Sequence, residues 1–210
     1  HLADFPRLPS YQAFCRRLNR LTFAIAALAE IWMEEKLRKT ESGQSYVLDS
    51  CPVIVSSGPR ANRAKTAREI CNLTRNSTRN LWYHGVKLHV FALLRPGKLP
   101  IPCAVQVSKA SYCDLWAAKQ IIFDCDPVRD GTLYADRAYI DADWKDTLKT
   151  QANIDLVTPR KKKKCDTLRS EDAASTFISG LRQPIEIYFN WLNVRTAIQN
   201  ASHVRSISGL

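Results

Sequence analysis

Three carboxylates occupy positions where acids are uncommon. Asp49 lies inside a β-branched, apolar segment, Asp136 ends another apolar segment, and Glu186 interrupts an aromatic helical pattern. They are separated by 87 and 50 residues. A buried acid is costly unless it is paired or bound to a cation. Three carboxylates suit Mg²⁺ or Mn²⁺ rather than zinc, and two such ions about 3.5–4 Å apart promote phosphodiester chemistry. The spacing therefore suggests a metal-dependent phosphodiester site.

Glu186 belongs to the segment "RQPIEIYFNWL". Proline suits the first turn of a helix, so Pro184 predicts that a helix begins there. Apolar side chains then recur at helical spacing, namely Ile185, Tyr188, Phe189 and Leu192. Glu186 falls at the border of this stripe, where it is either a first-turn acid favoured by the helix dipole or a metal ligand.

The two aspartates also have ordinary structural explanations. Asp136 precedes Arg137 and suits a salt bridge or a turn, and Asp49 could accept backbone hydrogen bonds beside Pro52. Twenty acids in 210 residues make some strand-end carboxylates inevitable. Spacing alone therefore leaves the metal site as one of several interpretations.

The remaining pattern predicts an α/β chain. A mostly buried helix is expected over Tyr11–Leu37, and its apolar run Leu21–Met33 is too short to span a bilayer. A strand is expected over Tyr46–Val55, with pairing interrupted after Asp49 because Pro52 cannot donate to a ladder. Residues 56–80 are expected to form a polar excursion. Further strands are expected over Gly85–Leu94, Ile101–Ser111, Gly131–Asp136 and Ile154–Pro159, and helices over Cys113–Ile122, Asp143–Gln151 and Ser170–Leu181. This order predicts a mixed sheet of about five strands flanked by helices, with an N-terminal helical segment.

The charge of the chain favours a polyanionic partner. Lysine and arginine total 31 against 20 acids, a net charge of +11, and nucleic acid is the commonest such partner. The cations concentrate in residues 58–80 and in "RKKKK" at Arg160–Lys164, around an aspartate-rich middle. Basic segments on either side of an acidic one suit a protein that binds phosphates at its edges and cations at its centre. Charged side chains spread over several solvent-exposed faces would give the same numbers of acidic and basic residues.

Cysteine usage indicates a reducing compartment. The seven cysteines are odd in number and contain no C-x-x-C, which argues against a disulfide framework and a common structural zinc site. No signal peptide or membrane span is predicted. The first residue is His1 rather than methionine, so we expect an N-terminal part to be missing.

Five short sequence segments, in this order along the chain, resemble segments of the DDE transposases of bacterial insertion sequences. They are "LPSYQAF" at Leu8–Phe14, "LDSCPV" at Leu48–Val53, "GVKLHV" at Gly85–Val90, "YADRAYID" at Tyr134–Asp141 and "RQPIEIYFNWL" at Arg182–Leu192. The resemblance implies an RNase H-like fold over residues 41–210, preceded by a helical linker or remnant of a DNA-binding region over residues 1–40. It implies that Asp49, Asp136 and Glu186 hold two Mg²⁺ or Mn²⁺ ions.

The implied activity is metal-dependent cleavage of element ends followed by strand transfer into target DNA. The expected partners are DNA and a second copy of the chain, in the bacterial cytoplasm at the nucleoid. The family's Arg-x₃-Glu spacing is present at Arg182, but its tyrosine and lysine positions hold Ser179 and Asn193. A structure-specific nuclease and a non-catalytic DNA-binding remnant stay open as alternatives.

Several side chains are expected to touch DNA. Phosphate contacts position a duplex without reading its sequence. The expected contacts are Lys87, His89, Arg137, Arg160, Lys161, Lys162, Lys163, Lys164 and Arg182. Trp82, Trp116 and Trp191 are expected in the core rather than as base-stacking platforms.

Overall fold

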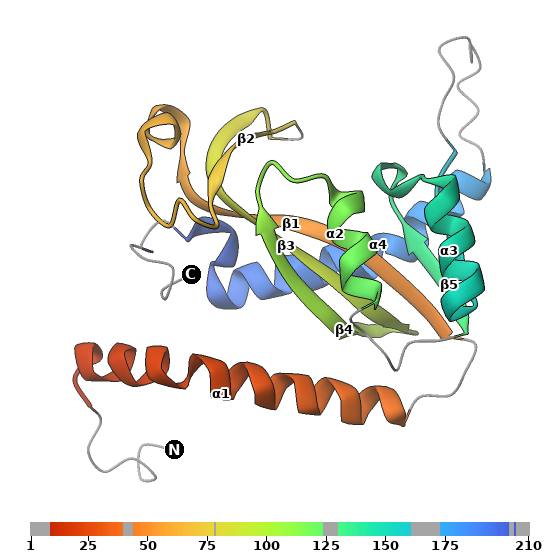
Figure 1. Cartoon of the computed structure of the whole chain (residues 1–210), viewed down its shortest axis with the longest axis horizontal. Helices are drawn as coiled ribbons and strands as arrows, with labels where there is room; N and C mark the ends of the chain where they lie inside the picture. The colour runs from red at the N-terminus through yellow and green to blue at the C-terminus, as the bar shows by residue number, and fades with distance from the viewer. Residues whose placement is uncertain are drawn as a thin grey trace.

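A six-stranded mixed sheet forms the centre of the molecule (Figure 1). The computed structural model describes residues 9–39, 44–77, 79–123, 130–160, 173–201 and 204. Its helices and strands are α1 (Tyr11–Arg38), β1 (Gln44–Ser57), β2 (Asn72–Asn76), β3 (Leu81–Arg95), β4 (Lys98–Lys109), α2 (Asp114–Phe123), β5 (Gly131–Ala135), α3 (Ala142–Ala152), β6 (Ile154–Val157) and α4 (Ala173–Thr196). Short 3₁₀ turns are η2 (Gly58–Arg63), η3 (Arg137–Tyr139) and η4 (Ile198–Asn200).

The strand order is β2-β3-β1-β5-β6, and β4 pairs with the same edge of β3 as β2 does. β1 runs antiparallel to β3 and parallel to β5, which is parallel to β6. The expected mixed α/β sheet flanked by helices is confirmed, and it is consistent with an RNase H-like fold. The sheet has one more strand than expected because β2 forms inside the polar excursion of residues 56–80.

Helices cover both faces of the sheet. Alternate residues of a strand point to opposite faces, and β1 follows this rule with two apolar sets. Tyr46 and Leu48 pack against α2 and α3, while Val47 and Val53 pack on the α4 side against Ile185. In Figure 1, α2 and α3 lie in front of the sheet and α4 lies behind it.

α4 does not begin at Pro184, so that expectation was wrong. The helix is continuous over Ala173–Thr196, with Pro184 inside it. A proline inside a helix loses one backbone hydrogen bond. The helix is held on both sides of this defect, by the buried Arg182 before it and the buried Ile185 and Phe189 after it. Tertiary packing therefore outweighs the local preference.

Pro52 does not interrupt the pairing of β1, contrary to expectation. The ladder with β3 continues through Pro52 opposite Lys87 as far as Ile54. β5 pairs with β1 only as far as Leu48, so beyond that point the other side of β1 has no ladder. A proline is tolerated in a strand whose outer side makes no such bonds.

The expected helix near the N-terminus forms, but it is not buried. Of the residues in α1 only Leu37 is buried, and it joins the core on the α2 side. Phe23, Ile31 and Trp32 are all more than half exposed. Apolar residues at helical spacing predict a helix, but they do not identify which surface covers the apolar side chains. No helix among the described residues is long and apolar enough to cross a membrane.

Gly85 is required by the close approach of β3 and β1. A Cβ atom at this position would overlap the backbone carbonyl oxygen of Val53. We expect Gly85→Ala to lower the free energy of unfolding by about 1–3 kcal/mol, because overpacking forces backbone shifts. Urea unfolding measures this loss. Gly180→Ala is the control, since a Cβ there meets open space and alanine favours a helix. Equal stability of Gly85→Ala and the native chain would contradict the prediction.

Candidate active site

Asp49 and Asp136 lie side by side where the parallel pairing of β1 and β5 ends. The last paired residues are Leu48 and Ala135, and the two aspartates follow them directly. Asp136 leaves its strand and caps η3, with Oδ1 accepting a hydrogen bond of 2.6 Å from the backbone N–H of Arg137. The fold thus brings together two acids that are far apart in the chain.

Arg182 of α4 lies between the two aspartates. Its Nη2 is 3.0 Å from Oδ2 of Asp49, and its Nη1 is 3.7 Å from Oδ1 of Asp136. The Arg182 side chain is 10% exposed, which makes it a buried cation rather than a surface arginine. Arg182 was expected to touch DNA, and in this conformation it is paired with both acids.

The environment of Asp49 raises the pKa of its carboxyl group to about 6, chiefly because burial disfavours the charged form. Arg182 and a hydrogen bond from the backbone N–H of Ser50 act in the opposite direction. The negative charges of Asp136 and Glu186 raise this pKa further. All three acids are therefore close enough to interact electrostatically.

Glu186 reaches this region from α4. It follows Arg182 by four residues, so the two side chains share one side of the helix. Glu186 itself is exposed, whereas Ile185 and Phe189 anchor the helix to the sheet. A rigid apolar stripe thus fixes the glutamate beside a cluster that already contains two acids and one arginine.

The donor set fits a hard divalent cation. Carboxylate oxygens are the preferred ligands of Mg²⁺ and Mn²⁺. The Arg182 guanidinium already stands between two of the carboxylates, which shows that their oxygens converge on one cationic group. No three acid, histidine or cysteine side chains of the described residues are grouped closely enough in this structure to hold a metal ion.

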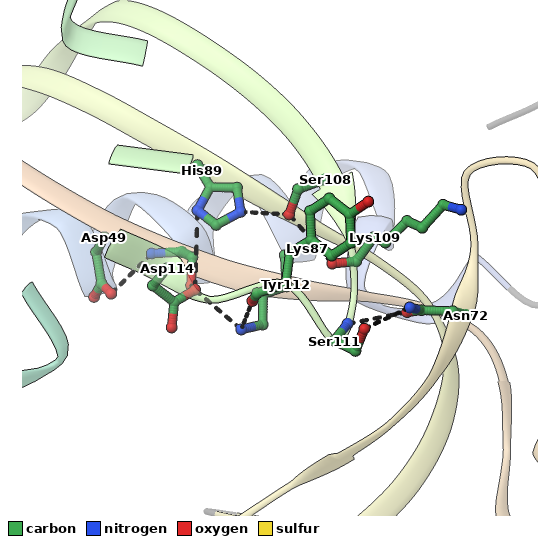
Figure 2. Close-up of polar contacts among 10 residues, drawn as sticks. Asp49, Asn72, Lys87, His89, Ser108, Lys109, Ser111, Tyr112 and Asp114 are labelled. Atoms are coloured by element: carbon green, nitrogen blue, oxygen red, sulfur yellow. Dashed lines mark hydrogen bonds and ion pairs between the residues drawn. The ribbon is translucent and has the colours of Figure 1, made fainter. Parts of the chain in front are cut away.

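A second polar cluster lies on the opposite face of the sheet, on the side of α2 (Figure 2). Asp114, the first residue of α2, accepts hydrogen bonds through Oδ1 from Ser50 Oγ at 2.9 Å and from Lys87 Nζ at 3.0 Å. His89 Nδ1 lies 3.9 Å from the same oxygen, and His89 Nε2 is 2.8 Å from Ser108 Oγ. Ser50 connects the clusters, because its backbone N–H is bonded to Asp49 and its hydroxyl to Asp114.

This arrangement gives Lys87 and His89 a different place from the one expected. They share one strand face, as predicted, but it is the face opposite to the Asp49 side chain. His89 is fully buried, and burial lowers the pKa of its imidazole to about 4, so the ring is neutral near pH 7. A neutral, buried ring is placed to orient neighbouring groups rather than to meet a DNA phosphate.

Asp114 is expected to stabilise the fold through this cluster. Asp114→Ala removes the acceptor shared by Ser50 and Lys87, and we expect the free energy of unfolding to fall by about 1–3 kcal/mol. Urea unfolding at pH 7 measures the change. Asp155→Ala is the matched control, because its ion pair with Lys149 is about half exposed and should contribute less than about 1 kcal/mol. Equal losses in the two variants would contradict the prediction.

The other expected DNA contacts are only partly described. Arg137 and Arg160 are exposed, and Lys161, Lys162, Lys163 and Lys164 lie outside the described residues. The three tryptophans expected in the core are instead partly exposed, by 52% at Trp82, 46% at Trp116 and 44% at Trp191.

Sequence reasoning missed the link formed by Ser50 and Asp114. Asp114 was expected only as a helix cap, because its distant partners cannot be inferred from local spacing. One signal was available: Lys87 and His89 are two positions apart, so they share one face of their strand, while Ser50 points to the face opposite to that of Asp49.

A family model described as "Transposase DDE domain" matches residues 39–207, which include Asp49, Asp136 and Glu186. No curated protein and no solved structure matches the chain.

Proposed function

Because the chain belongs to the transposase DDE-domain family, we propose that residues 41–210 are a catalytic domain that cuts and joins DNA at the Asp49–Asp136 cluster. The observation that carries this proposal is the convergence of Asp49 and Asp136 on Arg182, with the Glu186 charge acting on the same place. Asp49, Asp136 and Glu186 would hold two Mg²⁺ or Mn²⁺ ions. When bound, such ions activate an attacking oxygen and stabilise a leaving oxygen.

The proposed reaction has two steps. In the first, water attacks a phosphorus atom at the element end, the bond from that phosphorus to the 3′-oxygen breaks, and a free 3′-hydroxyl remains. In the second, this hydroxyl attacks a phosphorus of the target DNA, a new P–O bond forms, and the target strand's own P–O3′ bond breaks. The first step hydrolyses one phosphodiester and leaves a 5′-phosphate on the flanking strand, whereas the second step forms one phosphodiester for each one broken.

Arg182 has a role at each stage of this proposal. In this structure it pairs with the partly buried Asp49, and its Nε has no hydrogen-bond partner among the described residues. If the carboxylates held metal ions, the guanidinium of Arg182 would be suited to bind a phosphate oxygen, since arginine forms paired hydrogen bonds to phosphate. The exposed Arg137 and Arg160 add sequence-independent attraction to the DNA backbone. We place the working protein, as a dimer on DNA, in the bacterial cytoplasm at the nucleoid.

The decisive experiment detects joining without knowledge of the element ends. Labelled oligonucleotides of random end sequence are incubated with supercoiled plasmid, the chain and Mn²⁺, and covalent plasmid–oligonucleotide products are isolated and sequenced. Joined products from the native chain, absent with Glu186→Gln, are expected. Nicking without joining would favour the nuclease, and salt-dependent DNA binding without metal-dependent cleavage would favour the non-catalytic remnant.

A further inference from the structure

A basic lobe projects from the end of the sheet at which β2 lies (Figure 1). We define it as residues 58–77 and 79–82, which include η2, β2 and the start of β3. Its single acid is Glu69. Its cations are Arg60, Arg63, Lys65, Arg68, Arg75 and Arg79. A lobe with this imbalance attracts a phosphate backbone.

Trp82 is an exposed aromatic residue within this lobe. Its side chain is 52% exposed, although Tyr83, the next residue of the strand, is only 2% exposed. Trp82 stands directly opposite Arg75 across the β2–β3 pair, so the two side chains share one face. Leu73, two residues before Arg75 on that face, is also exposed, by 38%. An aromatic ring thus lies open beside a cation.

The ring lines a hollow between η2 and the β2–β3 pair. The hollow has a volume of about 480 Å³, within the ~300–1,000 Å³ range of ligand sites. Asn80 at its edge is held in place by a hydrogen bond from the Arg75 guanidinium. The lining residues are Gly58, Pro59, Asn62, Leu73, Asn80, Leu81 and Trp82. The hollow therefore combines an aromatic ring and apolar side chains with two amide groups, which both donate and accept hydrogen bonds.

We propose that this hollow binds an unpaired nucleobase of DNA, with Trp82 stacking on the base and the basic lobe attracting the neighbouring phosphates. An unpaired base is the chemistry that fits, because base faces in a duplex are covered by their neighbours whereas a splayed base offers its face to an aromatic side chain. Stacking is tolerant of base identity, so the site selects strand structure rather than sequence. The inference rests on DNA as the partner in the proposed function.

The hollow is remote from the chemistry. Ser57, the last residue of β1 before the lobe, lies eight positions after Asp49, which corresponds to about 26 Å along a strand. At about 3.4 Å per nucleotide, this is about eight nucleotides. The base held by Trp82 is therefore not the one beside the cleaved bond. The hollow would instead bind distorted or unpaired DNA at a distance from the cut.

The experiment compares DNA strands with and without bases. Fluorescence anisotropy measures binding of the 210-residue chain to a labelled dT12 strand and to an abasic 12-mer with the same backbone, in EDTA and about 50 mM salt. We expect Trp82→Leu to weaken dT12 binding by about tenfold, with abasic binding unchanged. Trp82→Phe keeps a ring and should retain most of the affinity. Trp116→Leu is the matched control, since Trp116 is similarly exposed but lies on α2, outside the basic lobe.

Each outcome has a defined meaning. The inference fails if Trp82→Leu weakens dT12 binding no more than Trp116→Leu does, or if it weakens abasic binding by the same factor. It also fails if the native chain binds both strands equally tightly, although DNA then stands as the partner. If the native chain binds neither strand, the proposed DNA partner fails together with the inference.

Discussion

Asp49→Asn, Asp136→Asn and Glu186→Gln are each expected to lower the rate of metal-dependent DNA cleavage by at least about 10³-fold. Each change removes one anionic oxygen ligand while preserving the size of the side chain. When catalytic groups act as a unit, removing one of them loses most of the rate enhancement that they provide together. Mn²⁺-dependent nicking of supercoiled plasmid gives the rate. Urea unfolding confirms that each variant is folded.

Metal binding separates this explanation from a loss of DNA contact. The relaxation of water protons by bound Mn²⁺ detects even weak sites, and we expect each of the three changes to weaken one shared site. Asp155→Asn is the control, because Asp155 is an exposed strand acid paired with Lys149 and lies away from the cluster. The assignment of the three acids as metal ligands would be refuted by a native cleavage rate in any of the three variants. It would also be refuted if the affinity of the Mn²⁺ site were unchanged in all three.

Arg182→Leu is expected to lower the free energy of unfolding by about 3 kcal/mol at pH 7.5. The change leaves the partly buried Asp49 without its closest counter-charge, and breaking a fully buried ion pair from one side typically costs about 3–5 kcal/mol. The Asp49 pKa is already raised to about 6, and loss of Arg182 raises it further. Because the folded state then holds a proton that the unfolded state releases, stability falls as pH rises through that value and recovers toward pH 5.

Two further measurements distinguish lost charge pairing from lost packing. Asp49→Asn combined with Arg182→Leu removes the uncompensated charge, so the double variant should be more stable at pH 7.5 than Arg182→Leu alone. Millimolar Mn²⁺ should also stabilise Arg182→Leu, because a divalent cation can replace the guanidinium. If the loss is the same at pH 5 and pH 7.5 and the double variant recovers nothing, packing rather than charge explains the effect.

Local pattern predicted most of the sheet because strands carry their own signals. The β-branched run around Asp49 and the apolar segment before Asp136 each indicate a strand without help from the rest of the chain. β2 was missed because "NLTRN" at Asn72–Asn76 is mostly polar, and its pairing with β3 is not visible in that segment alone. The helix start predicted at Pro184 was wrong for the opposite reason. Proline is a strong local signal for a helix start, but burial of the neighbouring residues outweighs it.

The candidate site was predictable as a set of residues but not as an arrangement. The three acids were selected from sequence, whereas the position of Arg182 between Asp49 and Asp136 depends on how α4 crosses the sheet. The face on which Lys87 and His89 lie depends on the register of β3 against β1. Such pairings join residues more than thirty positions apart, and no periodicity within one segment encodes them.

Because of the order of these elements along the chain, the residues of the acidic cluster are synthesised at different times. β1 and β5, which carry or precede the two aspartates, are made before α4, which supplies both Arg182 and Glu186. A nascent chain or degradation fragment that ends before residue 173 therefore has two acids with neither their counter-charge nor the third carboxylate. If the proposed site is correct, incomplete products of this gene cannot nick the chromosome of the cell that makes them, and only chains that contain α4 acquire that ability.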